Sequence, residues 1–238
     1  VQDIVEEEMR DYVDEIRRDE MQNLTCILNP DSDVKIMLSA HADEIGLMIS
    51  NIREDGRLQV IDRGGIVPAT YPGQQVRIRT SNGEVYGVVE AYRNLFKEEK
   101  LETRHFLIEI GAKDREDALK YVNLGDPIVR DTHIRKLANG KFTARALDDR
   151  LGVYIIMEAM KRAKERGCKA GVYGASTTGE ETTKTGAYWT STRINPTMAI
   201  VVDVTYASDY NGMDPAETGT VLLGDGPVLC NSPIVVKA

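Results

Sequence analysis

Four groups of acidic or imidazole side chains occur where an α/β fold would bring them together. The groups are His41-Ala42-Asp43-Glu44, Asp148-Asp149, Glu180-Glu181 and Asp203. Three of them directly follow runs that are typical of strands, and Asp148-Asp149 opens a long helical pattern. Ligands in open α/β sheets bind outside the carboxyl ends of the strands. One imidazole and several carboxylates meeting there would form the ligand set of a divalent-metal hydrolase.

Each group taken alone has a simpler explanation. A single Asp after a strand is usually a helix cap or a turn residue. A Glu pair in a first helical turn often only complements the helix dipole. A lone His is more often a hydrogen-bonded residue at the edge of a core than a ligand. All of these explanations would have to hold together, with every group at the same sheet edge by accident, so the metal-site hypothesis is favoured.

The residue types also suit the separate tasks of a site with two metals. Such a site needs a bridging carboxylate, further His and carboxylate ligands, and one carboxylate without metal that takes a proton from water. The adjacent Glu180 and Glu181 can divide these roles, because neighbouring side chains point in different directions. Asp43 lies two residues from His41 and can steady its imidazole. Hard oxygens with one imidazole suit zinc, cobalt or manganese.

Composition excludes several other classes. The 238 residues carry a net charge of −8 with no basic stripe, which argues against a nucleic-acid partner. No apolar run approaches the roughly 18 residues of a membrane span, so we expect no membrane partner. Cys26, Cys168 and Cys230 share no short spacing, which fits neither a disulfide framework nor a thiolate zinc site. Three reduced thiols in a cytoplasmic protein are the simplest interpretation.

The outer parts of the chain alternate between helical and strand patterns. Apolar spacing predicts a helix over about 1–20, and a hairpin-like linker leads into a strand over 34–40. A helix over 149–167 with Gly167 as its C-cap follows later in the chain. The sequence then predicts strands over 170–178 and 197–202, with a helix from about Glu181 between them. These segments predict one α/β sheet.

The middle of the chain has a different character. Asn82-Gly83 stands between two alternating runs, which is a strong hairpin signal, and residues 106–110 and 128–129 suggest further strands. We therefore expect a discontinuous α/β domain formed by 1–57 and 137–238. A small β domain over 58–136 is expected to interrupt it.

The motifs together resemble the M42 metallo-aminopeptidases, a family that includes glutamyl and tetrahedral aminopeptidases and some members labelled endoglucanases. The segments that carry the resemblance are Ser39–Gly46, Ala146–Gly152, Glu180–Ala187, and Val201–Thr205 with Ser208-Asp209. The segment from Gly64 to Gly73 also looks like the inserted β domain of the family. The resemblance covers essentially the whole chain.

The resemblance implies a zinc-exopeptidase-like mixed sheet flanked by helices, with two divalent metals (zinc, cobalt or manganese) per subunit. It implies an enzyme that removes N-terminal residues from short peptides, and a homo-oligomer such as a dodecamer, assembled partly through the inserted domain. By position, it implies that His41 and Asp203 bind one metal and that Asp148 bridges both. It further implies that Glu181 binds the second metal, that Glu180 is the general base and that Asp43 orients His41.

Two departures from the family pattern matter. Thr183 stands where the family usually has Gly. The last ligand of the family is a His near the C-terminus, whereas the other histidines of this chain, His105 and His133, fall in the β domain. The chain opens within a helical pattern and without Met, and 233–238 resembles the start of a strand or helix, so we expect a chain truncated at both ends. We expect such a chain to hold about one metal and to have little or no activity.

Two alternative functions stay open. Paired carboxylates also cleave glycosidic bonds, so a glucanase-like glycoside hydrolase is one of them. Trp189 is the single tryptophan and aromatic residues make up 6% of the chain, which is little for a sugar platform. The glycosidase hypothesis also leaves the imidazole beside the carboxylates unexplained. The other alternative is a catalytically inactive fragment or subunit.

Overall fold

A computed structural model describes residues 1–230, except for the side chain of Thr218. The segment 233–238, in which we expected a new element, lies outside the described residues. A first compact unit spans Val1–Asp203, and the chain after it forms a second. Among the described residues of the second unit there is one short helix, α5 (Pro215–Thr218). No described helix combines the length and the apolar character that crossing a bilayer would require.

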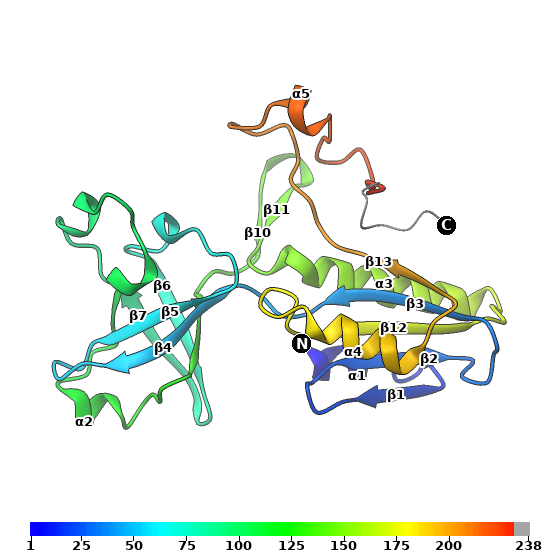
Figure 1. Cartoon of the computed structure of the whole chain (residues 1–238), viewed down its shortest axis with the longest axis horizontal. Helices are drawn as coiled ribbons and strands as arrows, with labels where there is room; N and C mark the ends of the chain where they lie inside the picture. The colour runs from blue at the N-terminus through cyan, green and yellow to red at the C-terminus, as the bar shows by residue number, and fades with distance from the viewer. Residues whose placement is uncertain (231–238) are drawn as a thin grey trace. The chain divides into compact units, whose positions relative to one another are not determined.

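The first unit contains a five-stranded sheet with the strand order β1-β2-β12-β3-β13 (Figure 1). Its strands are β1 (Glu15–Arg18), β2 (Leu24–Leu28), β3 (Lys35–His41), β12 (Gly171–Thr177) and β13 (Met198–Val201). β12 and β13 run parallel to β3 on its two sides, whereas β1 and β2 form an antiparallel edge. The register places Thr177 beside His41. The carboxyl ends of three strands therefore meet at one edge of the sheet.

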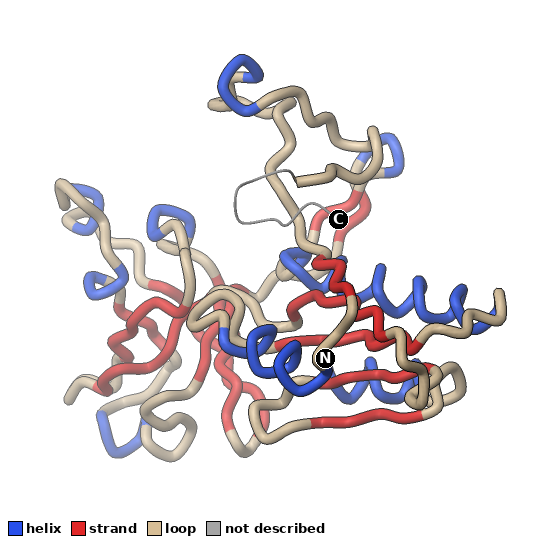
Figure 2. The backbone as a smooth tube through the Cα atoms, turned by 45° about the vertical axis from the view of Figure 1, so that its right-hand side comes forward, coloured by secondary structure: helices blue, strands red, loops and turns tan. Residues whose placement is uncertain are grey.

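Helices cover both faces of this sheet, and Figure 2 shows them in blue against the red strands. They are α1 (Gln2–Met9), α3 (Leu147–Glu165) and α4 (Thr185–Ile194). Alternate residues of a strand face opposite sides. Leu24 and Cys26 of β2 accordingly share a buried cluster with α1 and α3, whereas Ile27 packs in another cluster with Ile194 of α4. The expected mixed sheet flanked by helices is confirmed.

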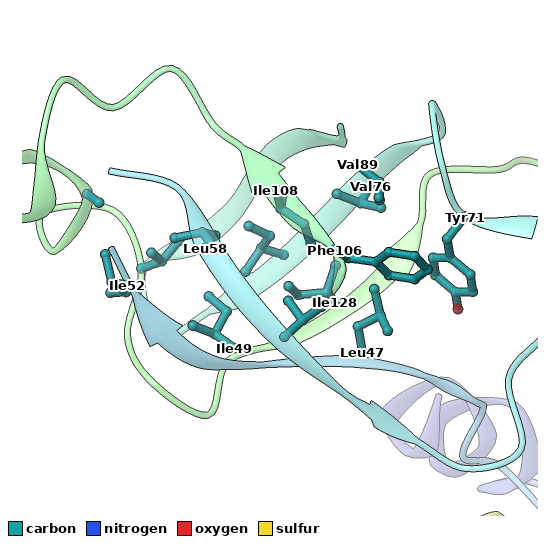
Figure 3. Close-up of a cluster of buried hydrophobic side chains, with 14 of the residues drawn as sticks. Leu47, Ile49, Ile52, Leu58, Tyr71, Val76, Val89, Phe106, Ile108 and Ile128 are labelled. Atoms are coloured by element: carbon teal, nitrogen blue, oxygen red, sulfur yellow. The ribbon is translucent and has the colours of Figure 1, made fainter. Parts of the chain in front are cut away.

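Between β3 and α3 the chain forms a closed β-barrel with the strand order β4-β5-β8-β7-β6-β9. Its strands are β4 (Gly46–Ile52), β5 (Leu58–Arg63), β6 (Gln75–Thr80), β7 (Gly83–Val89), β8 (Leu107–Glu109) and β9 (Pro127–Arg130). Figure 3 shows the apolar side chains that fill it. Phe106 is fully buried there and stacks on Tyr71, with ring centroids 6.2 Å apart. Closure leaves the barrel without a free strand edge.

Short elements complete the first unit. They are α2 (Arg115–Ala118), the ribbon of β10 (Arg135–Lys136) and β11 (Phe142–Thr143), and 3₁₀ turns at Pro68–Thr70, Leu95–Lys97, Thr103–His105 and Ala138–Gly140. The ribbon connects the barrel to α3 along the chain. The segment after the barrel therefore leads directly to the Asp148-Asp149 pair.

Two segments differ from the expectation. The barrel begins with β4 at Gly46, ahead of the boundary expected near residue 58, because Leu47 and Ile49 already face the barrel core. The first helix ends at Met9, where a helix to about residue 20 was expected. The segment after it forms β1, because Ile16 pairs with Cys26 of β2 at the antiparallel edge.

Candidate metal and catalytic site

His41 ends β3 at the carboxyl edge of the sheet and is only 3% exposed. Its Nε2 lies 3.0 Å from Asp148 Oδ1, 3.8 Å from Glu180 Oε2 and 4.0 Å from Asp203 Oδ1. The parallel strands explain how residues so distant in the sequence meet. His41 ends β3 and Asp203 follows β13, so both lie at one edge of the sheet. Asp148, at the start of α3, lies at the same edge.

His41, Asp148 and Asp203 each offer one donor atom, and these atoms all lie within 4.8 Å of one another. Bonds from zinc to nitrogen or oxygen are about 2.0–2.2 Å long, so donors on a common tetrahedral ion lie about 3.4 Å apart. The observed separations of His41 Nε2 from the two carboxylates bracket that value. The donor set therefore fits a single divalent cation with only small movements.

The two carboxylates at the start of α3 have different surroundings. The Asp148 side chain is 56% exposed and faces His41, whereas Asp149 is fully buried. Asp149 accepts hydrogen bonds from the backbone amides of His41 (3.3 Å) and Gly152 (3.0 Å). A Cβ on Gly152 would overlap that carboxylate, so the position requires glycine. Asp149 thus fixes the end of β3 against α3, and Asp148 is left to face the site.

Asp43 connects the imidazole to the Glu pair. Its carboxylate accepts hydrogen bonds from the backbone amides of Glu180 and Glu181, both at 3.2 Å. Its Oδ1 also lies 3.4 Å from His41 Nδ1, which makes no hydrogen bond of good geometry, so this contact is mainly electrostatic. These contacts hold the pKa of Asp43 below its ordinary value, although burial opposes them.

The Glu pair lies in the loop between β12 and α4, not in a helix as expected, because α4 begins only at Thr185. Asn23 anchors the start of this loop, since its Oδ1 accepts a hydrogen bond of 2.8 Å from the Thr178 amide. A Cβ on Gly186 would overlap the Thr178 carbonyl and approach Asn23 Oδ1 to 2.6 Å. The close packing of β2, β12 and α4 therefore positions the loop.

Comparison with known proteins shows the family. Residues 23–235 match the model of the M42 glutamyl aminopeptidases. The chain belongs to this family. It is similar to a lysyl aminopeptidase of Pyrococcus furiosus, with 31% identity over 242 residues that cover 98% of this chain and 68% of that protein.

Solved structures agree with the M42 assignment. An aminopeptidase from the archaeon Desulfurococcus kamchatkensis matches with a TM-score of 0.87 and 35% identity, over 95% of this chain and 63% of that one. The TET1 peptidase of Pyrococcus horikoshii, which can assemble into a tetrahedron or a large octahedral shell, matches with a TM-score of 0.77 and 30% identity. That match covers 85% of this chain and 62% of the TET1 chain. The chain thus spans about two thirds of the length of these M42 relatives.

The acidic surroundings change the protonation of this candidate site. Burial alone would lower the pKa of His41, but the contact with Asp43 and the charges of Asp203 and Asp148 outweigh it and raise that pKa to about 9. Burial and the nearby Asp148 charge raise the pKa of Glu181 to about 7. The metal-free site therefore holds protons at neutral pH on groups that a cation would need deprotonated.

Metal binding is accordingly expected to release protons. At about pH 7, His41 carries a proton that a cation must displace, and Glu181 carries part of another. Affinity should therefore increase with pH, by about tenfold per unit for each proton released, and level off above the pKa of His41 near 9. Titration calorimetry of zinc binding in buffers of different ionisation enthalpy measures the number released. A value of zero at neutral pH would contradict the role of His41 as a ligand.

The structure places the remaining predicted residues as follows. Glu180 lies beside His41, while Glu181 lies outside the three-donor group and contacts Asp43 through its backbone amide. His105 caps a 3₁₀ turn in the barrel segment, and His133 lies next to Asp131. Neither belongs to the donor group among the described residues.

Three charged residues beside the site had no predicted role, although Glu44 belongs to the first acidic group. Glu44 accepts hydrogen bonds from Arg145 and Arg150, which flank the Asp148-Asp149 pair along the chain. Glu44 belongs to the first motif and Arg150 to the second, which was a signal that they could interact. Arg145 has no such signal, because one more arginine before a helix is ordinary in a sequence.

Proposed function

We propose that the protein containing this chain is a metal-dependent aminopeptidase that removes N-terminal residues from short peptides. The observation that supports this most is a buried imidazole, His41, whose Nε2 faces carboxylates at the strand ends of an M42 family member. An imidazole with hard oxygen donors is a ligand set for zinc, cobalt or manganese. A glycosidase has no use for this imidazole, so that function is not proposed.

The donor residues and the Glu pair divide the chemistry. Divalent ions bound here would polarise the scissile carbonyl and lower the pKa of water. His41, Asp148 and Asp203 would hold one ion, and Asp148 with Glu181 would contribute to a second. The Glu180 carboxylate, 3.8 Å from His41 Nε2, is within reach of a water among these donors. We propose that Glu180 accepts the proton of the attacking water and passes it to the departing amine.

A chelation experiment tests this function. The full-length protein should hydrolyse aminoacyl-nitroanilides, lose that activity in EDTA, and regain it when zinc or cobalt is restored. Parallel assays on a β-glucan should show no sugar release. Hydrolysis that survives chelation, or metal-independent cleavage of the glucan, would contradict the proposal.

We further propose that the barrel contributes to self-association. Its strands contain none of the proposed metal donors, and the similar TET1 peptidase can assemble into a tetrahedron or a large octahedral shell. Light scattering should give a mass of many subunits for the protein, and a much smaller mass after the barrel is replaced by a short linker between residues 45 and 131. An unchanged mass would assign assembly to another surface.

The free cysteines Cys26, Cys168 and Cys230 are consistent with a cytoplasmic location, which we also propose.

A further inference from the structure

Glu44 lies three residues after His41 and interacts with two arginines at once. Its Oε1 accepts hydrogen bonds from Arg145 Nη1 and from Arg150 Nη2, the latter at 2.8 Å. Arg150 Nε also donates to the Ala42 carbonyl at 3.3 Å. We define Glu44, Arg145 and Arg150 as the arginine clamp.

The arginine clamp connects the two chain segments that carry His41 and Asp148. Arg145 precedes Asp148 by three residues and Arg150 follows it by two, so the turn that carries Asp148 is held on both sides. Both attachments converge on the segment directly after His41. The Asp148 side chain is itself 56% exposed, so apart from its contact with His41 Nε2 little packing fixes the carboxylate. Its position therefore depends on the backbone, which the clamp holds together with the amide contacts of Asp149.

We infer that Glu44 is a positioning residue that sets the separation between Asp148 and His41. This inference rests on the metal site of the proposed function. In the site without a cation the hydrogen bond from His41 Nε2 holds the Asp148 carboxylate, whereas the nearby carboxylates of Glu180 and Asp203 repel it and favour an outward movement. The clamp opposes that movement, and its two guanidiniums against one carboxylate leave a positive charge beside the acidic group.

The burial of the clamp makes it more than a surface ion pair. The side chains of Glu44 and Arg145 are 15% and 18% exposed, and that of Arg150 is 34% exposed. Neutralising Glu44 would leave two partly buried guanidiniums without a charged acceptor. They would then turn toward water or toward the site carboxylates, and either change moves Asp148 relative to His41.

Cobalt binding to the Glu44→Gln protein tests the inference, because the visible absorption of bound Co²⁺ reports donor geometry directly. Loss of a residue that orients a ligand typically weakens metal binding by about 10–100-fold. We expect Glu44→Gln to weaken Co²⁺ binding by at least about tenfold and to change the absorption bands. Arg145→Gln, which removes one attachment, should act in the same direction.

Glu90→Gln is the matched control, because it also neutralises a partly buried carboxylate bound to an arginine, Arg57. Arg57 precedes β5, and the other end of β5 leads to the site. The length of this strand, about 20 Å, therefore separates the Glu90–Arg57 pair from the site. We expect Glu90→Gln to lower the melting temperature about as much as Glu44→Gln while leaving Co²⁺ affinity and absorption unchanged.

The outcomes separate the clamp from the proposed function. If wild-type protein binds Co²⁺ and Glu44→Gln binds it with the same affinity and spectrum, the clamp has no positioning role. If the Glu44→Gln protein fails to fold, the Arg145→Gln protein decides the question by the same two measurements. If wild-type protein binds no Co²⁺ at all, the proposed metal site is wrong and the clamp inference falls with it.

Discussion

In the full-length protein, replacing Glu180 with Gln is expected to lower kcat by about two to four orders of magnitude, the usual loss for a general base. The amide is nearly isosteric with the carboxylate but cannot accept a proton from water. His41, Asp148 and Asp203 remain in place, so bound metal and KM should change little. Kinetics on an aminoacyl-nitroanilide, together with metal analysis of the same sample, measure both quantities.

The neighbouring carboxylate provides the contrast. Glu181→Gln should lower metal content as well as kcat, because we propose Glu181 as a ligand of the second ion. Glu20→Gln, on an exposed side chain, should leave both unchanged. A Glu180→Gln protein that turns over at the wild-type rate would mean that another group accepts the proton.

In the full-length protein, replacing Asp148 with Asn is expected to have the larger effect on the metal itself. Asp148 is the carboxylate closest to His41 Nε2, at 3.0 Å, and we propose that it contacts both ions. A neutral amide is a poor substitute for a bridging carboxylate. Mutation of residues that only orient a ligand already weakens metal binding by up to about 100-fold. Both ions should therefore bind at least about 100-fold more weakly. Activity at micromolar metal should then disappear.

Competition with a chromogenic chelator measures this loss of affinity. Asp31→Asn, in the turn that precedes β3, removes the same charge at the opposite edge of the sheet and should bind metal as the wild type does. Retention of two ions by the Asp148→Asn protein would exclude the bridging role. Retention of one would assign Asp148 to a single ion.

The sequence predicts much of this arrangement because local patterns mark strand ends. The apolar run before His41 and the one before Asp203 each end a strand, and parallel strands place such ends together. The Asp148-Asp149 pair marks the start of a helix with clear amphipathic spacing. These signals are local, so they can be found without knowing which strands pair.

What the sequence leaves out depends on contacts between distant segments. The segment around Ile16 has helical spacing, yet it forms β1 because the edge of β2 offers a partner. β4 follows His41 so closely that no composition shift marks the start of the barrel at Gly46. Arg145 becomes part of the site only because Glu44, 101 residues away, lies against it.

The start of α4 shows the same limit at the site. The sequence predicts that Glu180 and Glu181 lie in a first helical turn. In the structure, however, Gly179 and Lys184 both adopt positive φ angles, 78° and 58°. These two residues bend the chain into a loop before the helix begins. The backbone amides of the Glu pair are thereby free to bind Asp43. A propensity argument cannot anticipate a loop whose amides are satisfied by a carboxylate 137 residues away.

The seam that closes the barrel also affects how the site can assemble during folding. His41 and Asp148 are 107 residues apart in the chain, but β4 pairs with β9, where Leu47 faces Ile128. Once that seam has formed, only the six residues from His41 to Leu47 and the twenty from Ile128 to Asp148 remain as free chain. The entropy cost of closing the loop falls accordingly by about 1 kcal/mol. A barrel that folds early would therefore speed the contact between His41 and Asp148, although the barrel itself contributes no metal donor.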